Sequence, residues 1–357
     1  MSQDPIRVLI VDDSSLVRRT LSEVLASDDG IAVMEPAADP FEAAARMRKQ
    51  VPDVMILDVA MPRMDGLSFL RRVMKQHPIP TIVCSAVTWS NSPAALSAID
   101  LGAVDVIEKP NISTAEFFEE ARVRFCDAVK AAARARLRRI GSRPAPAGGR
   151  HEYAERSAKP LRGAAQKNDR LVVAGASTGG IEALQILLRG LPRSFCGIAI
   201  VQHMPAGFTT AFAARLDAEC SISVKEARDG DAIEPGLALI APGDHHMSVR
   251  RTGHQYHVEV SNGPLVNRHR PSVDVLFESA ADAAGANAIG VLMTGMGEDG
   301  SRGLLKLRRA GAETIAQDEA TCVVYGMPAA AVRLGAVSEI LPIDAIAGAL
   351  LRKVGTP

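Results

Sequence analysis

The feature that most constrains this chain is a repeated pattern in which a short apolar run ends in a polar residue and a helical pattern follows. Near the N-terminus, Ile6–Val11 ends in Asp12-Asp13, and further on Val54–Leu57 ends in Asp58. Runs that are apolar throughout are typical of parallel strands covered on both faces. Strands that alternate with helical patterns therefore predict an α/β fold with an open, doubly wound parallel sheet.

The same pattern returns in the C-terminal half. Leu171–Val173 leads into the stretch AGASTGG, and Ile181–Leu191 has helical spacing; the apolar runs 197–201 and 288–293 follow. A chain of 357 residues is long enough for two such domains, each with its own core. We therefore predict one α/β domain at residues 1–127 and a second at 167–357.

The segment between the two domains, residues 128–166, has a different composition. From Lys130 to Arg170 there are twelve Lys or Arg residues against three Asp or Glu, a net charge of +9. Gly, Pro, Ala and Ser are frequent and large apolar residues are scarce, so the segment cannot support a core. The composition predicts a flexible basic linker, and a solvated tether is favoured over a dedicated binding arm.

Composition excludes several classes of protein. The formal net charge is zero, so no global charge points to nucleic acid or to an anionic membrane surface. The N-terminus has no basic segment followed by a long apolar one, and no run is long enough to span a bilayer. The five scattered cysteines favour reduced thiols over a metal site or a disulfide framework. We expect a cytoplasmic protein that neither binds nucleic acid nor inserts directly into a membrane.

Five polar residues follow the apolar runs of the first domain: Asp12, Asp13, Asp58, Ser85 and Lys109. The carboxyl ends of parallel strands meet at one edge of a sheet, so these side chains are expected to share a cleft. Three carboxylates suit a hard divalent cation such as Mg²⁺, and a hydroxyl with an ammonium group suits a phosphoryl group. A single aspartate of this kind would be read as a helix N-cap, but five together favour a site.

This constellation resembles the response-regulator receiver domain, over residues 5–125. The resemblance implies that Asp58 accepts a phosphoryl group from a histidine kinase, with Mg²⁺ held by Asp12, Asp13 and Asp58 itself. It also implies that Ser85 and Lys109 contact the phosphoryl group. Receivers often carry an aromatic switch residue three positions before the lysine. Here that position is Val106, so aromatic gating does not carry over.

The stretch AGASTGG allows two interpretations. Gly175, Ser177 and Gly179 match the G-x-S-x-G pattern of a serine nucleophile, while a glycine-rich turn before a helix can also hold a phosphate. A dinucleotide site would call for an acidic residue at the end of the next strand. That strand ends in QHMP, with His203 instead, which counts against the phosphate reading.

Ser177, His203 and Asp299 each follow a predicted strand of the second domain. A nucleophile, a base and an orienting acid are what acyl transfer requires. The glycines around them leave backbone N–H groups free for an oxyanion, near Thr178 and Met296. Taken singly, Ser177 would be interpreted as a helix cap, His203 as a turn histidine and Asp299 as a loop residue that caps a helix. Together, the three residues favour a catalytic triad. The chain order Ser, His, Asp disfavours an ordinary α/β-hydrolase.

The motifs GASTGG, QHMPAGFT and TGMGEDG, downstream of a receiver, closely resemble the chemotaxis protein-glutamate methylesterases. The resemblance spans nearly the whole chain. It implies the triad Ser177, His203 and Asp299, with no cofactor at the esterase site. It further implies hydrolysis of glutamyl methyl esters on chemoreceptor cytoplasmic domains, deamidation of receptor glutamines, and a chemotaxis histidine kinase as phosphodonor. Asn often precedes the aspartate in this family, whereas here it is Glu298.

Two other functions fit the sequence less well. The second domain could be a binding module with a vestigial triad, which the joint presence of the triad residues and the glycines disfavours. A receiver-linked transcription factor would need a helix-turn-helix with a basic recognition helix, and no such pattern is present.

Other residues have structural readings. Phe208, Phe212 and Leu216 are expected in the core. The histidines of residues 245–257 are expected to be scattered on the surface or on a hairpin, and not to form a zinc site. Residues 268–270 (RHR) form a basic spot that could face an acidic receptor surface, with an exposed loop as the favoured reading.

Overall fold

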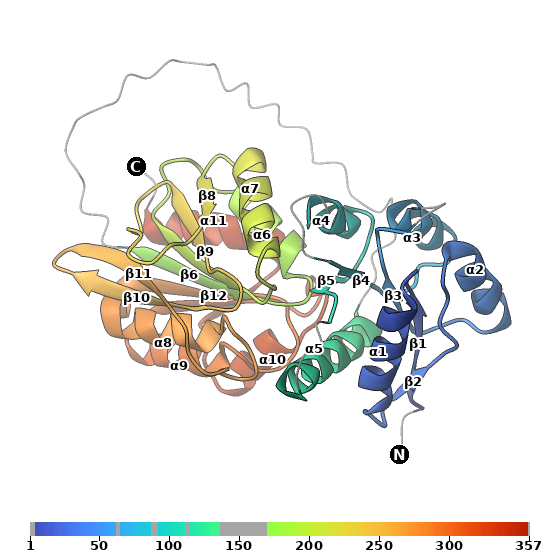
Figure 1. Ribbon diagram of the computed structural model, residues 1–357. Helices are drawn as coiled ribbons and strands as arrows, with labels where there is room; N and C mark the ends of the chain where they lie inside the picture. The colour runs from blue at the N-terminus through green and yellow to red at the C-terminus, as the bar shows by residue number, and fades with distance from the viewer. Residues whose placement is uncertain (1–3, 62–64, 87–91, 111–114, 136–169, 356–357) are drawn as a thin grey trace, which may run out of the picture.

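A computed structural model describes residues 4–61, 65–86, 92–110, 115–135 and 170–355. Most of the predicted linker, 136–166, lies outside the described residues. The remainder forms two α/β domains, and both are built on parallel sheets as the sequence predicts (Figure 1).

The first domain is a five-stranded parallel sheet in the order β2-β1-β3-β4-β5. Helices α1 and α5 cover one face, where Leu21 and Phe125 are fully buried, and α2, α3 and α4 cover the other (Figure 1). The elements are β1 (Ile6–Val11), α1 (Ser15–Ala26), β2 (Ile31–Val33), α2 (Pro40–Lys49), β3 (Val54–Leu57), α3 (Gly66–Gln76), β4 (Thr81–Ser85), α4 (Ser92–Asp100), β5 (Asp105–Glu108) and α5 (Ala115–Arg134).

The second domain contains a seven-stranded parallel sheet in the order β14-β13-β12-β6-β7-β9-β8 and a separate antiparallel hairpin, β10-β11. The elements are β6 (Leu171–Ala176), α6 (Gly180–Arg189), β7 (Ile198–Gln202), α7 (Phe208–Glu219), β8 (Ser223–Glu226), β9 (Leu237–Ile240), β10 (His246–Thr252), β11 (Gln255–Ser261), α8 (Val273–Ala284), η1 (Gly285–Asn287), β12 (Ala288–Leu292), α9 (Ser301–Arg309), β13 (Glu313–Gln317), α10 (Met327–Arg333), β14 (Glu339–Leu341) and α11 (Ile343–Val354).

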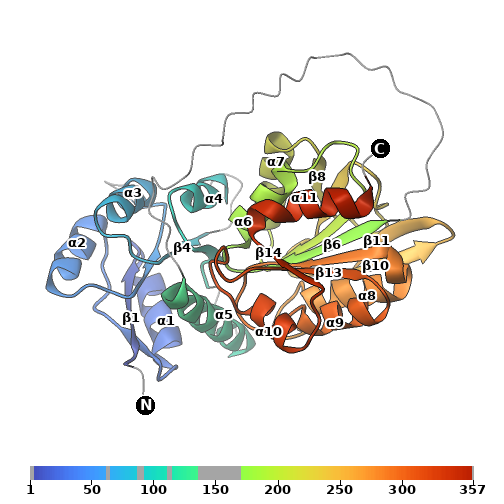
Figure 2. The same ribbon diagram turned by 180° about the vertical axis from the view of Figure 1, so that it is seen from behind.

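This larger sheet is covered on both faces. Helices α6, α7 and α11 pack on one face, where Phe208, Phe212 and Leu216 lie in the core as predicted, and α8, α9 and the hairpin pack on the other (Figure 2). Strand order reverses beside β6: the chain moves from β6 to β7 on one side and later fills β12, β13 and β14 on the other. Such a switch point, at the carboxyl ends of the strands, is where doubly wound sheets bind ligands.

The first domain lies against the second with α4, β5 and α5 (Figures 1 and 2). Helix α4 packs on α7. The Arg215 guanidinium of α7 donates to the Asp100 carboxylate at 2.7 Å and to the Leu96 carbonyl at 3.1 Å.

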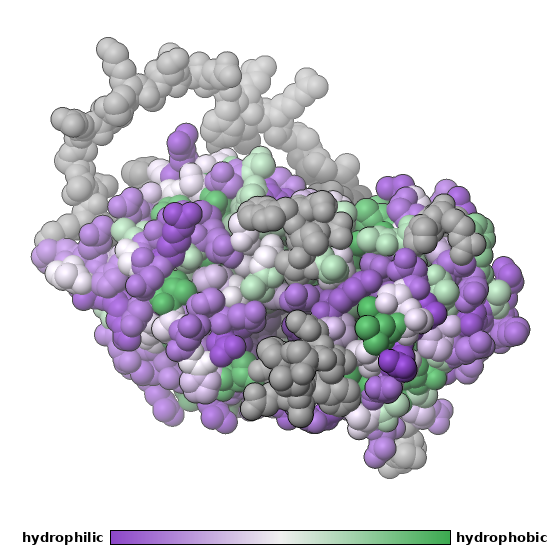
Figure 3. Space-filling model, viewed as in Figure 1, coloured by the Kyte–Doolittle hydropathy of each residue, from purple (hydrophilic) through white to green (hydrophobic). Residues whose placement is uncertain are grey.

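The face seen in Figure 3 is mainly hydrophilic, with apolar side chains in small separate groups. Within the described residues, no helix combines the length and the apolar character needed to cross a membrane.

Candidate active site

Three neighbouring strands of the larger sheet bring Ser177, His203 and Asp299 to its carboxyl edge. The strands are β6, β7 and β12, with β6 in the middle. Backbone hydrogen bonds fix the first two residues at the strand ends. The Ser177 N–H donates to the Thr294 carbonyl at 3.0 Å, and the His203 N–H donates to the Ala176 carbonyl at 3.1 Å.

Glycine allows the backbone to turn closely around Ser177. Gly179, the N-cap residue before α6, has a φ of 79°, and a Cβ atom there would lie 2.5 Å from the Val323 Cβ. A Cβ atom at Gly295 would lie 2.7 Å from the Cβ of Ser177. Any other residue would therefore push the loops on either side of Ser177 apart.

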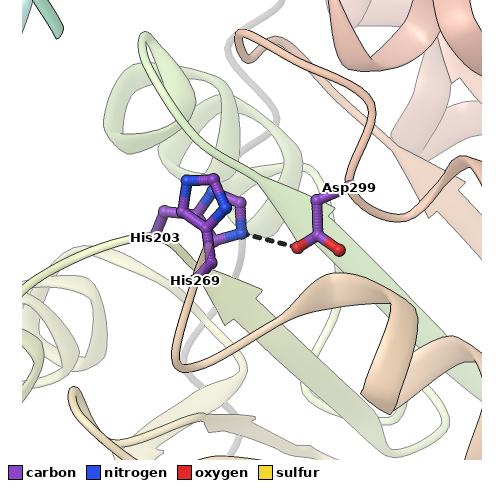
Figure 4. A group of neighbouring side chains, drawn as sticks. All are labelled: His203, His269 and Asp299. Carbon is purple, nitrogen blue, oxygen red and sulfur yellow. Dashed lines mark hydrogen bonds and ion pairs between the residues drawn. The ribbon is translucent and has the colours of Figure 1, made fainter. Parts of the chain in front are cut away.

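His203 and Asp299 form a direct, buried pair. The His203 Nε2 atom lies 2.8 Å from the Asp299 Oδ2 atom, and the two side chains are 7% and 1% exposed (Figure 4). The carboxylate can only accept, so Nε2 carries the proton. The other ring nitrogen, Nδ1, is buried and has no partner among the described residues. That nitrogen is thus left with a free lone pair, as a general base requires.

Asp299 accepts four further hydrogen bonds at the N-terminus of α8. The donors are the Ser272 hydroxyl at 2.8 Å, the Val273 N–H at 2.7 Å, the Asp274 N–H at 3.2 Å and the Asn267 side-chain amide at 2.7 Å. Burial alone would raise the pKa of Asp299, but the bonds to His203, Asn267 and Val273 hold it far below its ordinary value. The carboxylate therefore stays ionised.

His269 is a residue of this site that sequence reasoning missed. Its ring stacks on the His203 ring, with centroids 3.7 Å apart and planes 9° apart (Figure 4). Burial, and then the neighbouring His203, lower the pKa of His269 to about 3. The expectation of an exposed basic loop at 268–270 is therefore wrong for His269. It holds for Arg268, whose side chain is 69% exposed and 3.7 Å from Asp127 of the first domain.

Ser177 and the candidate oxyanion donors lie at the same carboxyl edge of the sheet as this pair. Among the described residues, the backbone N–H groups of Thr178 and Met296 donate to no protein acceptor. No hydrogen bond joins the Ser177 hydroxyl to His203 in the described part of the chain. Bonds of this kind often tighten only when substrate is bound. The arrangement places a serine at the same sheet edge as an oriented histidine, and two backbone N–H groups there have no protein acceptor among the described residues.

His203, His269 and Asp299 also bring their ligand atoms within 4.8 Å of one another, as a metal site would. The geometry fits a metal poorly. A ligating imidazole directs its lone pair in the plane of its ring, and the lone pairs of two nearly parallel, stacked rings do not converge on one point. Asp299 is moreover already engaged by the Nε2 atom of His203.

The first domain gathers its predicted polar residues in the same way. Carboxylate oxygens of Asp12, Asp13 and Asp58 lie within 4.8 Å of one another. The Lys109 Nζ atom lies 2.7 Å from Asp12 Oδ2 and 2.8 Å from Asp58 Oδ2. Burial alone would lower the pKa of Lys109, but hydrogen bonds to these two carboxylates raise it. A cleft of three carboxylates that one cation neutralises only in part is suited to a divalent ion and a phosphoryl group.

Ser85 and Val106 lie near this cleft. Ser85 is fully buried at the end of β4, with its hydroxyl 3.4 Å from the Ala86 carbonyl. Val106 is 4% exposed within β5. It is core, not a surface switch.

Asp105, the first residue of β5, connects the two domains at the candidate active site. Its carboxylate accepts a hydrogen bond of 3.0 Å from the Thr178 hydroxyl, next to Ser177. Burial raises the pKa of Asp105 to about 6, and the Val106 N–H, the Thr178 hydroxyl and the charge of His203 oppose that rise. A carboxyl group of the first domain thus bonds to the residue that follows Ser177, the candidate nucleophile.

The remaining residues singled out from the sequence have structural roles. All five cysteines are free, and His254 and His257 lie on the β10-β11 hairpin. His246 is buried, accepting from the Ser272 N–H at 3.2 Å. Glu298 is 65% exposed and lies 4.0 Å from Arg302.

Comparison with known proteins decides the family. Residues 172–350 match the family model described as CheB methylesterase, and residues 8–121 match the response regulator receiver domain. The chain belongs to the CheB methylesterase family. This excludes the transcription-factor reading of the second domain.

Relatives of this family match over almost the full length. The chain is 58% identical to a protein-glutamate methylesterase/protein-glutamine glutaminase of Anaeromyxobacter dehalogenans, covering 98% of this chain and 97% of the relative. It is 55% identical to a protein of that name from Geobacter metallireducens, covering 98% and 99%. The crystal structure of the Thermotoga maritima CheB methylesterase catalytic domain matches 52% of this chain and 98% of its own, with 38% identity and a TM-score of 0.51.

The hydrogen bonds at Asp299 generate a stability prediction. Asp299→Asn loses the ionic attraction to its buried donors, so we expect the catalytic domain to lose about 3–5 kcal/mol at neutral pH. Because the pKa of Asp299 is lowered on folding, the stabilisation is complete above the ordinary carboxyl pKa and fades as pH falls below about 4. Urea unfolding of both proteins at several pH values measures this.

The control for this experiment is Asp282→Asn, which alters an exposed carboxylate paired with Lys306. We expect it to cost less than about 1 kcal/mol. A loss at Asp299→Asn that equals the control, or that does not shrink in acid, would contradict the assignment.

Proposed function

We propose that this CheB-family protein is a phosphorylation-controlled serine hydrolase. It removes methyl esters from glutamate side chains of methylated chemoreceptors and deamidates receptor glutamines. The observation that carries the proposal is the His203–Asp299 pair, whose free Nδ1 atom lies at the same sheet edge as Ser177. The names of the close relatives support the substrate class.

The chemistry follows from the positions of the protons. Nδ1 of His203 takes the Ser177 hydroxyl proton while the serine oxygen attacks the ester carbonyl carbon. Asp299 keeps Nε2 protonated and stabilises the imidazolium that forms. The N–H groups of Thr178 and Met296 stabilise the oxyanion. The imidazolium then gives its proton to the leaving methoxide, and methanol departs from the acyl-enzyme.

Deacylation repeats these steps with water. Nδ1 takes a proton from water, whose oxygen attacks the acyl carbon, and Ser177 leaves with the proton returned from His203. The product is a glutamate carboxylate. A glutamine side chain reacts at the same atoms, with ammonia leaving in place of methanol. One site therefore serves both activities.

Ser177→Ala tests the nucleophile. We expect methanol release from methylated receptors to fall by at least about 10³-fold, as triad removals typically do. Ser261→Ala, which alters an exposed serine at the end of β11, should leave the rate unchanged. Near-normal turnover in a folded Ser177→Ala protein would rule out this mechanism.

The receiver supplies the control. We propose that Asp58 accepts a phosphoryl group from a chemotaxis histidine kinase, with Ser85 and Lys109 contacting its oxygens. Mg²⁺ fits the three carboxylates of Asp12, Asp13 and Asp58 and would neutralise charge on the phosphoryl group. The free thiols support a cytoplasmic location, where such partners are found.

A small-molecule phosphodonor such as acetyl phosphate tests this site. We expect a hydroxylamine-labile acyl phosphate on the wild-type protein only when Mg²⁺ is present, and none on Asp58→Asn. Asp29→Asn, which alters an exposed receiver carboxylate, should be labelled normally. Peptide mapping that located the phosphoryl group on Asp12 or Asp13 would refute the assignment.

We further propose that the unphosphorylated receiver, residues 1–127, blocks the catalytic domain, residues 167–357. The Asp105 carboxyl group bonds to Thr178 and lies within electrostatic reach of the His203 side chain. The Asp105 carboxyl group has the same chemical structure as the carboxylate product. It therefore competes with the acyl group of the substrate for the active site. Phosphorylation at Asp58 reshapes the neighbouring β4-β5 face and withdraws the Asp105 carboxyl group from the catalytic domain.

Asp105→Ala removes this contact, and we expect the unphosphorylated protein to become about tenfold more active, within the range of ordinary allosteric couplings. Asp29→Asn is the matched control. Because the pKa of Asp105 is raised in the contact, the contact is strongest below the ordinary carboxyl pKa and weakens as pH rises through about 6. The ratio of unphosphorylated to phosphorylated activity should therefore rise over that range in the wild type.

Asp105→Asn provides the pH control, because its amide does not titrate. The activity ratio of this variant should not change through pH 6. An Asp105→Ala protein with unchanged basal activity, and a normal acyl phosphate at Asp58, would show that the receiver acts by another surface.

A further inference from the structure

We propose that His269 is a positioning residue for His203: its stacked ring fixes the plane of the His203 imidazole so that Nδ1 faces Ser177. The inference rests on the proposed function. It concerns a residue outside the triad, on the loop that precedes α8.

The need for such a residue follows from the contacts of His203. Its ring has one hydrogen bond, from Nε2 to Asp299, and its Nδ1 atom has no partner in the described part of the chain. One hydrogen bond holds the Nε2 atom but does not by itself stop the ring from turning about its Cβ–Cγ bond. A flat surface 3.7 Å away and tilted by only 9° blocks that rotation.

His269 is itself held in one orientation and one charge state. Its Nδ1 atom lies 2.7 Å from the Asn267 carbonyl, which can only accept, so Nδ1 carries the proton. Burial and the neighbouring His203 keep its pKa near 3. A neutral ring does not repel the positive charge that forms on His203 during attack, whereas a charged ring would.

The loop that carries His269 is strained and anchored. Asn267 and Arg268 have φ values of 50° and 67°, which non-glycine residues seldom adopt. The side-chain amide of Asn267 donates to Asp299 and to Asp274, both at 2.7 Å. Val266 and His269 exchange backbone hydrogen bonds of 2.9 and 3.1 Å. Strain persists at a site only where the surroundings enforce it, and here the enforced element carries the stacked ring.

Substitution of His269 by Ala and by Phe tests the proposal. In the phosphorylated full-length protein we expect His269→Ala to lower kcat by about 10–100-fold, the cost of a misplaced catalytic group, with KM within about twofold. The rate at which a fluorophosphonate labels Ser177 should fall by the same factor. His269→Phe offers a flat ring without nitrogen atoms, so it should recover most of both rates. His254→Ala, on the exposed hairpin turn, is the matched control.

A spectroscopic readout separates positioning from folding. A proton on Nε2 bonded to Asp299 should give a downfield proton NMR signal, and we expect the signal in the wild type and His269→Phe but not in His269→Ala. Wild-type kcat in His269→Ala would overturn the proposal. So would a folded His269→Phe protein as slow as His269→Ala, because stacking would then not be the function. Failure of the proposed function itself is distinct: fluorophosphonate would still label Ser177→Ala.

Discussion

The structure of the catalytic domain around its candidate site depends on hydrogen bonds to one buried negative charge, the Asp299 carboxylate. Asp299 is 1% exposed, and an unpaired carboxylate at that depth would cost several kcal/mol. Its donors are His203 and four groups within residues 267–274. That segment must therefore fold over Asp299, and in doing so it begins α8 and places His269 on His203. The charge that binds His203, the proposed base, also organises the loop that carries the stacked ring of His269.

The buried carboxylates of the protein differ in how well they are satisfied, and this difference parallels their proposed roles. Asp299 has five donors and a strongly lowered pKa, so its position is fixed. Asp12 and Asp58 share the single cation of Lys109, and burial raises the pKa of Asp12 in spite of it. Asp105 keeps a raised pKa in its contact with Thr178. Incompletely compensated charge is what a cation, a phosphoryl group or a domain movement can relieve.

The sequence predicted the parts of this structure that follow from a repeated local pattern, namely the strands and the polar residues at their ends. Apolar runs identified the strands. Because the carboxyl ends of parallel strands converge, Ser177, His203 and Asp299 could be grouped without knowledge of the strand order. His269 and Asn267 could not be found this way, because loop residues show no periodicity. The positive φ values of Asn267 and Arg268 could not be predicted either, because neither residue is a glycine. Their only trace is the polar stretch NRHRPS before an apolar helix. Asp105 was missed because a residue that begins a strand gives no sign of contact with another domain.

The contacts between the domains are of a kind that a phosphoryl group can reverse. Arg215 pairs with Asp100, which is 55% exposed, and Arg268 lies 3.7 Å from Asp127 with 69% of its side chain exposed. Exposed pairs such as these contribute about 0–1 kcal/mol each. The Asp105–Thr178 bond carries the cost of burying a carboxyl group, so its net contribution is also small. The packing of α4 on α7 adds to these small contributions. A coupling of about 1–3 kcal/mol is comparable in size to contacts of this kind. Because Arg268 belongs to the same loop as His269, release of the first domain would remove a contact from the segment that carries the ring stacked on His203.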